Sequence, residues 1–109
     1  MTSKKATKSA LLGRTLPESD VEIPGVGTVR VRGITRGQYL HAGRAMAGDD
    51  PDVQRFEKLL ITAGMVDPAL SEDEVGQWQR TAGAGEIARV VEMIQELSGA
   101  RQDAPKSGV

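Results

Sequence analysis

The chain has 109 residues, of which 39% are hydrophobic and 27% charged, with a formal net charge of −1 and no cysteine. This length suits one hydrophobic core, and the lack of cysteine excludes disulfides, thiol chemistry and cysteine-based zinc sites. No stretch approaches the roughly 18 apolar residues of a membrane-spanning helix, and the basic N-terminus lacks the apolar run of a signal peptide.

Charge and composition divide the chain into three parts. The first 16 residues contain four basic side chains and no acidic one, whereas the remainder is acidic overall. We therefore predict a flexible basic tail over residues 1–20, a single domain over residues 21–99 and a flexible polar tail over residues 100–109. An acidic body argues against a nucleic-acid-binding domain, which normally presents a basic face.

The domain is predicted to begin with a β-hairpin. Aliphatic and charged residues alternate along residues 21–23 and 28–32, which is the two-residue period of a half-buried strand. Pro24 and Gly25 lie between the two segments and form a turn signal. Because two strands alone are marginally stable in water, the apolar face of this hairpin needs a helix to cover it.

Capping residues and apolar spacing predict the helices that follow. Thr35 with Gln38 and Ser71 with Glu74 have the spacing of capping boxes, and Pro51 suits a first helical position. The predicted helices cover residues 35–47, 51–63, 71–81 and 85–98, and a connector covers residues 65–68. The expected fold class is α+β, mostly α, with a short N-terminal β-hairpin followed by about four helices in a small bundle.

No pattern in the sequence points to catalysis. His41 is the only histidine, and Asp49, Asp50 and Asp52 lack the ligand order and the glycine of a calcium loop. The glycine pairs lack the spacing of phosphate-binding loops, and no serine has a paired base. We therefore expect a protein that is not an enzyme and has no catalytic residue, cofactor or metal site.

Binding to a partner is the remaining kind of function. The helix predicted over residues 85–98 has the clearest amphipathic stripe in the chain, and Met93 and Leu97 lie at its edge. Trp is enriched at binding hot spots, and Met adapts to varied surfaces. Trp78, Met93 and Leu97 are thus the candidate partner-binding residues. The alternative for Trp78 and for the Met93 and Leu97 edge is packing in the core of the domain, and Met93 has the further alternative of being a single exposed apolar residue with no function.

Three segments, in this order, resemble a known family. They are the strand pair and helix start over residues 21–35; Leu59-Leu60 and Gly64-Met65-Val66-Asp67-Pro68, with Leu70-Ser71 and Glu74; and the last helix from Gly85-Glu86-Ile87-Ala88-Arg89 to Ile94-Gln95-Glu96-Leu97-Ser98-Gly99. In order and spacing they resemble the small tail assembly chaperones of long-tailed, siphovirus-like bacteriophages. The resemblance covers residues 21–99.

The resemblance implies a function without chemistry. Proteins of this family are thought to coat the phage tape measure protein in the host bacterial cytoplasm, to keep it soluble during tail assembly, and to be absent from the mature virion. They are often made in two lengths by ribosomal frameshifting, so a longer form is expected too. The family has no catalytic residues to carry over. Self-association is a further expectation, because a core this small gives modest stability.

Two other functions stay open. One is a structural head–tail or tail component of a phage particle, which would be present in purified virions. The other is a small nucleic-acid-binding regulator that uses the helices over residues 35–47 and 51–63. Gly37 and the acidic body count against the regulator, so nucleic acid is not an expected partner. A membrane is not expected either, because no apolar stretch is long enough to span one.

Overall fold

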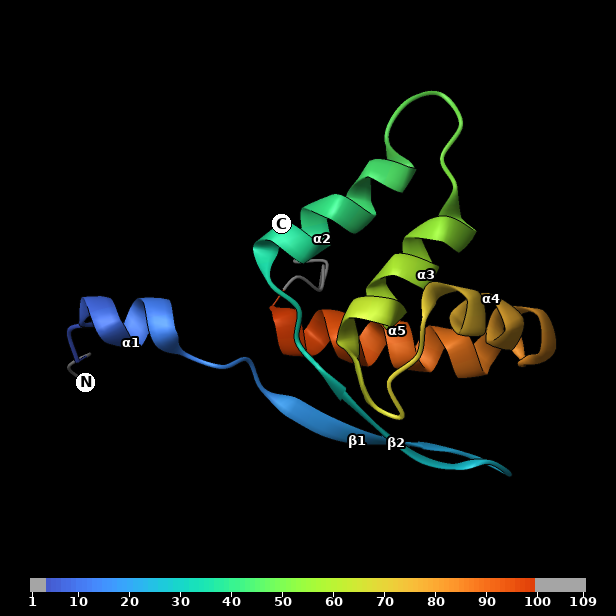
Figure 1. Cartoon of the computed structure of the whole chain (residues 1–109), viewed down its shortest axis with the longest axis horizontal. Coiled ribbons are helices and arrows are strands. Elements are labelled where there is room, and N and C mark those ends of the chain that lie inside the picture. Colours follow the sequence, from blue (N-terminus) through green and yellow to red (C-terminus); the bar gives the residue numbers. More distant parts are fainter. Residues whose placement is uncertain (1–3, 100–109) are drawn as a thin grey trace, which may run out of the picture.

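The protein is a mostly helical α+β domain in which a β-hairpin lies across a group of helices (Figure 1). The structure is a computed structural model and describes residues 4–99. The elements, in chain order, are α1 (Lys8–Gly13), β1 (Glu18–Ile23), β2 (Gly27–Arg32), α2 (Arg36–Gly43), the 3₁₀ turn η1 (Arg44–Met46), α3 (Val53–Gly64), β3 (Met65–Asp67), α4 (Glu72–Thr81) and α5 (Ala84–Ser98).

The sheet is antiparallel, with strand order β1-β2-β3. On its wet face, Arg30 of β2 donates from Nε to Glu18 Oε1 at 2.7 Å and from Nη1 to Asp20 Oδ1 at 2.8 Å. These hydrogen bonds to Glu18 and Asp20 raise the pKa of Arg30 above its usual value. All three side chains are well exposed, so the pairs help to fix the strand register and add little stability.

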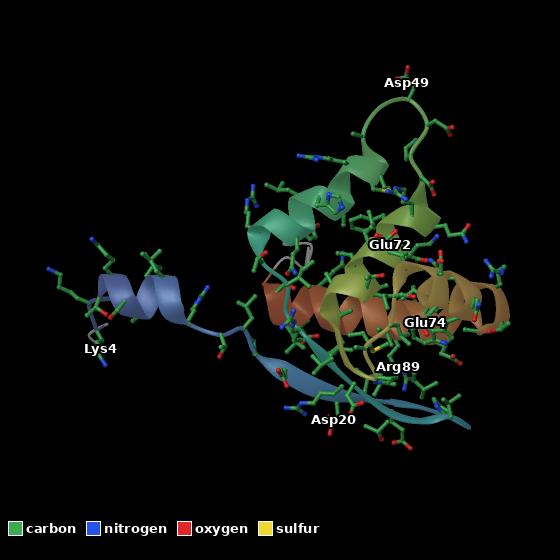
Figure 2. The ribbon with its side chains drawn as sticks, viewed as in Figure 1. Lys4, Asp20, Asp49, Glu72, Glu74 and Arg89 are labelled. Carbon is green, nitrogen blue, oxygen red and sulfur yellow. The ribbon has the colours of Figure 1, made fainter. Side chains whose placement is uncertain are left out.

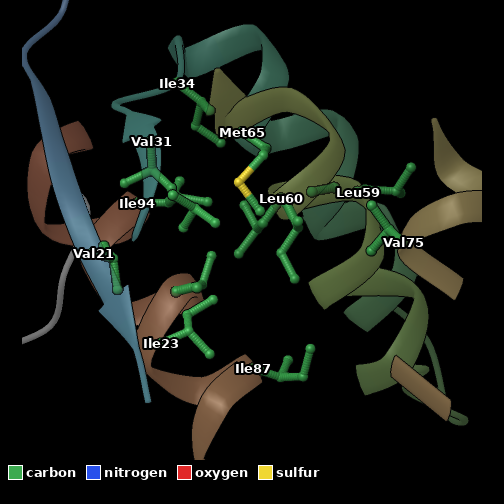
Figure 3. Close-up of a cluster of buried hydrophobic side chains, with 14 residues drawn as sticks. Val21, Ile23, Val31, Ile34, Leu59, Leu60, Met65, Val75, Ile87 and Ile94 are labelled. Carbon is green, nitrogen blue, oxygen red and sulfur yellow. The ribbon is translucent and has the colours of Figure 1, made fainter. Parts of the chain in front are cut away.

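The dry face of the hairpin is covered by α5, which also packs against α3. The core cluster takes residues from the hairpin, α3, α4 and α5, and Val31 and Val75 lie at opposite sides of it in Figure 3. Leu60 and Ile94 are fully buried. The buried residues, all hydrophobic, are Val21, Ile23, Val29, Val31, Ile34, Ala42, Leu59, Leu60, Ile61, Met65, Val75, Ile87, Val90 and Ile94.

The end of α5 is held against the end of β2 at Gly33. A Cβ atom on Gly33 would lie 2.6 Å from the backbone oxygen of Leu97, so a glycine is needed for this close approach. The next residue, Ile34, donates its backbone N–H to Ser98 Oγ at 2.8 Å. Gly33 itself donates to the backbone oxygen of Pro17 at 2.9 Å. These contacts tie the first strand, the second strand and the last helix together at one point.

Both predicted capping boxes are confirmed. In each, the hydroxyl of the first residue (Thr35 or Ser71) accepts from the backbone of the third helical residue, whose side chain accepts in return from the backbone of the cap. The start of α3 differs from the prediction: Asp52 is the cap, and its carboxylate accepts from the backbone N–H of Arg55 at 3.0 Å. A charged cap that satisfies a free N–H outweighs the preference of Pro51 for a first helical position.

Three other boundaries also differ from the prediction. β1 begins at Glu18, not at residue 21, because Arg30 pairs with the acids that precede Val21. The helix predicted over 35–47 ends at Gly43 and tightens into a 3₁₀ turn, which is common at helix C-termini. Residues 65–67 of the predicted connector form β3, which ends before Pro68, a residue with no N–H to offer a strand partner.

The terminal segments were predicted to be flexible tails. The structure places α1 and the first residues of β1 within residues 1–20, and residues 100–109 lie outside the described part of the chain. Within residues 4–99, no helix combines the length and the apolar character that a membrane crossing requires.

The burial of Leu60 predicts a large effect of truncation. Leu60→Ala should lower the free energy of unfolding by about 2–5 kcal/mol, because it removes apolar contacts and leaves a cavity in a packed core. Val53→Ala is the matched control: Val53 is 53% exposed, and its truncation should cost much less. Chemical denaturation followed by circular dichroism measures both. Equal losses for the two variants would contradict this description of the core.

The close approach at Gly33 predicts opposite effects for two glycine substitutions. Gly33→Ala should destabilise the domain by about 1–3 kcal/mol, because the new methyl group meets the backbone of α5 and the strand or the helix must shift. Gly43→Ala adds the same methyl group in α2, where no atom lies within 4 Å of it, and should stabilise by about 0.4–1 kcal/mol. Thermal unfolding of both variants against the wild type gives the two signs. A neutral Gly33→Ala would show that α5 does not pack this tightly on β2.

Candidate partner-binding groove

An apolar groove of about 500 Å³ lies between the closed end of the hairpin and α4. Its floor is formed by core residues whose outer surfaces face the groove, and its rim by residues that are partly or fully exposed. The apolar residues that line it come from the hairpin and from the connector before α4: Ile23, Val26, Val29, Met65, Pro68 and Leu70.

The hairpin turn places one aliphatic side chain at the groove in full contact with solvent. Val26 donates its backbone N–H to the oxygen of Ile23 at 3.0 Å, which closes the turn. Gly25 and Gly27, on either side, have φ values of 81° and 139°, which L side chains rarely adopt. Val26 is therefore held at the tip in a turn fixed by its neighbours, and it stays 71% exposed.

The opposite wall is α4, which presents Glu74, Gln77, Trp78 and Thr81. The capping box at Ser71 fixes where this helix begins and hence which residues face the groove. Trp78 is half-buried against the core, and its indole Nε1 donates to Glu86 Oε2 of α5 at 2.7 Å. This hydrogen bond satisfies the only polar atom of the indole, so the ring offers an apolar surface to the groove.

The electrostatic character of the groove is acidic on its α4 side. Glu74 lines the groove, and Glu72 and Asp73 precede it on the same exposed first turn of α4 (Figure 2). These acids are favourable at the positive end of the helix dipole. Of these three acids only Glu74 lines the groove, whereas Glu72 borders a separate hollow beside His41. The groove thus combines an apolar surface with one carboxylate at its rim.

Of the three side chains selected from the sequence, the groove takes in only Trp78. Met93 and Leu97 are half-buried and pack against the core, and neither lines the groove. Both lie on the same stripe of α5 as Arg89, since the three are four residues apart. Arg89 donates to the backbone oxygen of Glu22 at 3.2 Å, and Leu97 meets Gly33. The helix α5 therefore lies along the hairpin, with Arg89 at β1 and the backbone of Leu97 at Gly33.

Several groove residues were not selected from the sequence. Val26 sits in a predicted turn, and Leu70 and Pro68 sit in a predicted connector, where apolar residues carry no periodic signal. The one available signal was Val26 between Gly25 and Gly27, because an aliphatic side chain in a tight turn has few neighbours to cover it.

A second hollow lies on another part of the described chain. His41 is exposed and borders a shallow hollow of about 320 Å³ beside α3, together with Glu72. Among residues 4–99, no three histidine or acidic side chains are grouped so that they could hold a metal ion.

The chain was compared with protein families, with curated proteins and with solved structures. No family model matches it, and neither the curated proteins nor the solved structures contain a match.

Proposed function

We propose that this protein is a non-enzymatic tail assembly chaperone of a long-tailed bacteriophage. In this proposal it acts in the cytoplasm of the host, where it binds the tape measure protein, and it leaves before the virion matures. The observation that carries the proposal is the apolar groove beside Trp78, in a chain whose segments follow the order found in that family. No cofactor, metal or nucleic acid enters this function.

A helical client suits the groove physically. A tape measure protein forms a long amphipathic helix, and its apolar stripe promotes aggregation unless another surface covers it. A groove with an apolar floor and one charged rim can receive such a stripe by helix-in-groove packing, with the client's polar residues left in water. Trp78 and Val26 are suited to be the principal contacts, because one is an aromatic anchor and the other is fully accessible.

The placement of Met93 and Leu97 modifies the expected binding surface. Both side chains are half-buried against the core and neither lines the groove, so in this proposal their role in binding is indirect: they support the core on which the groove is built. In the proposal the direct contact passes to Val26, Leu70 and Trp78.

Co-expression with the tape measure protein of the same phage tests the proposal. The wild-type chain should raise the soluble fraction of that protein several-fold and should co-purify with it, because its apolar stripe is then covered. Val26→Asp should reduce both effects, since it puts a charge into the groove without touching the core. Val53→Asp is the control: Val53 is an exposed valine that does not line the groove, so this variant should behave as the wild type.

Two outcomes would count against the proposal. A tape measure protein that is equally soluble with and without the chain would remove its basis. Recovery of the chain from purified virions would favour the structural head–tail or tail component instead.

A further inference from the structure

The N-terminal arm, defined here as residues 4–16, bears a short helix that its own domain does not cover. Thr7 caps α1, its Oγ1 accepting from the backbone N–H of Ala10 at 3.1 Å. No residue of α1 is buried, and Leu11 and Leu12 are 64% and 75% exposed. A helix of six residues is marginal in water on its own, so these two leucines need another surface to become ordered.

The charge of the arm is opposite to that of the groove. The arm carries Lys4, Lys5, Lys8 and Arg14 and no acidic residue. Glu74 lines the α4 side of the groove, so both the apolar and the charged features of the arm have a counterpart there. Figure 2 shows Lys4 on the arm and Glu72 and Glu74 on the main body, well separated within one chain.

The direction of the hairpin determines whether the groove is more directly reached by the arm of the same molecule or by the arm of another copy. Glu18 pairs with Arg32 at the open end of the hairpin, where the arm leaves the domain. The groove lies beside Val26 at the closed end. The arm would have to reverse at residue 17 and run back along the whole of β1 to reach its own groove, whereas the arm of another molecule can approach from solvent.

We propose that the arm of one copy docks in the groove of a second copy. Leu11 and Leu12 pack on Val26, Leu70 and Trp78, and the lysines of the arm lie beside Glu74 of α4. Arm and groove are different surfaces, so the contact is head-to-tail and builds either an open chain of copies or a closed ring.

The chemistry of the contact sets how it responds to conditions. Only two leucines and a few exposed charges take part, so association is modest and depends on protein concentration. Added salt weakens it, because the lysines and Glu74 are exposed and their attraction is screened. The arm also competes with any helical client for the groove, but the self-association itself needs no client and stands apart from the proposed function.

Sedimentation equilibrium of the full chain tests the proposal. The average mass of the wild type should rise with concentration at low salt and fall at high salt. The arm variant, with both Leu11→Asp and Leu12→Asp, and the groove variant Val26→Asp should each stay monomeric. Val53→Asp replaces another exposed valine, which is 53% exposed and lines neither the arm nor the groove, and it should associate as the wild type does.

Mixing the two defective variants gives the decisive measurement. The arm variant keeps an intact groove and the groove variant keeps an intact arm, so together they should form a one-to-one pair that grows no further. Such a pair also shows that both variants are folded. A wild type that is monomeric at every concentration, or a mixture that fails to pair although the wild type associates, would overturn the proposal.

Discussion

The contact between α5 and the hairpin is the constraint on which the rest of the structure depends. Two strands cannot keep an apolar face dry by themselves, and Val21, Ile23, Val29 and Val31 are buried only because other elements cover that face. The cover comes mainly from α5, whose stripe of Ile87, Val90 and Ile94 is itself buried in the same contact. Because α5 also packs against α3, it joins the hairpin to the other helices.

The closeness of that contact has structural consequences at both ends of the hairpin. At the open end, Gly33 lets the helix backbone approach the strand, and Ser98 accepts a hydrogen bond from the residue after it. At the closed end, the strands continue to a turn whose Val26 remains in solvent. The connector and α4 stand beside this turn, and the space between them is the groove.

Local sequence signals predicted the elements of this fold that depend on local chemistry. Thr35 with Gln38 and Ser71 with Glu74 specify helix starts through side chains three residues apart, and the alternation around Val21 and Val29 specifies a two-faced strand pair. β3 was missed because a strand of three residues has no period to detect, and its existence depends on Val31 and Arg30 being available as partners.

The candidate site was harder to predict for a physical reason. An amphipathic stripe indicates that a helix packs on another surface, and Met93 and Leu97 pack against the chain's own core. Trp78 was selected from residue type, and it does line the groove. The other wall combines Val26 of the hairpin turn with Pro68 and Leu70, which come some forty residues later in the chain. Residues so far apart in sequence come together only when the domain folds, so no local pattern predicts this wall.

The outer edge of β1 affects how this protein can aggregate. Within the described residues, β1 forms one border of the sheet, and an open border is a template onto which another chain can add a strand. Here every second residue of β1 is an acid on the wet face of the sheet, namely Glu18, Asp20 and Glu22. The guanidinium of Arg89 donates a hydrogen bond to the backbone oxygen of Glu22. A second β1 added at this edge would bring three acids beside three acids, so growth of amyloid-like sheets is disfavoured even at high protein concentration.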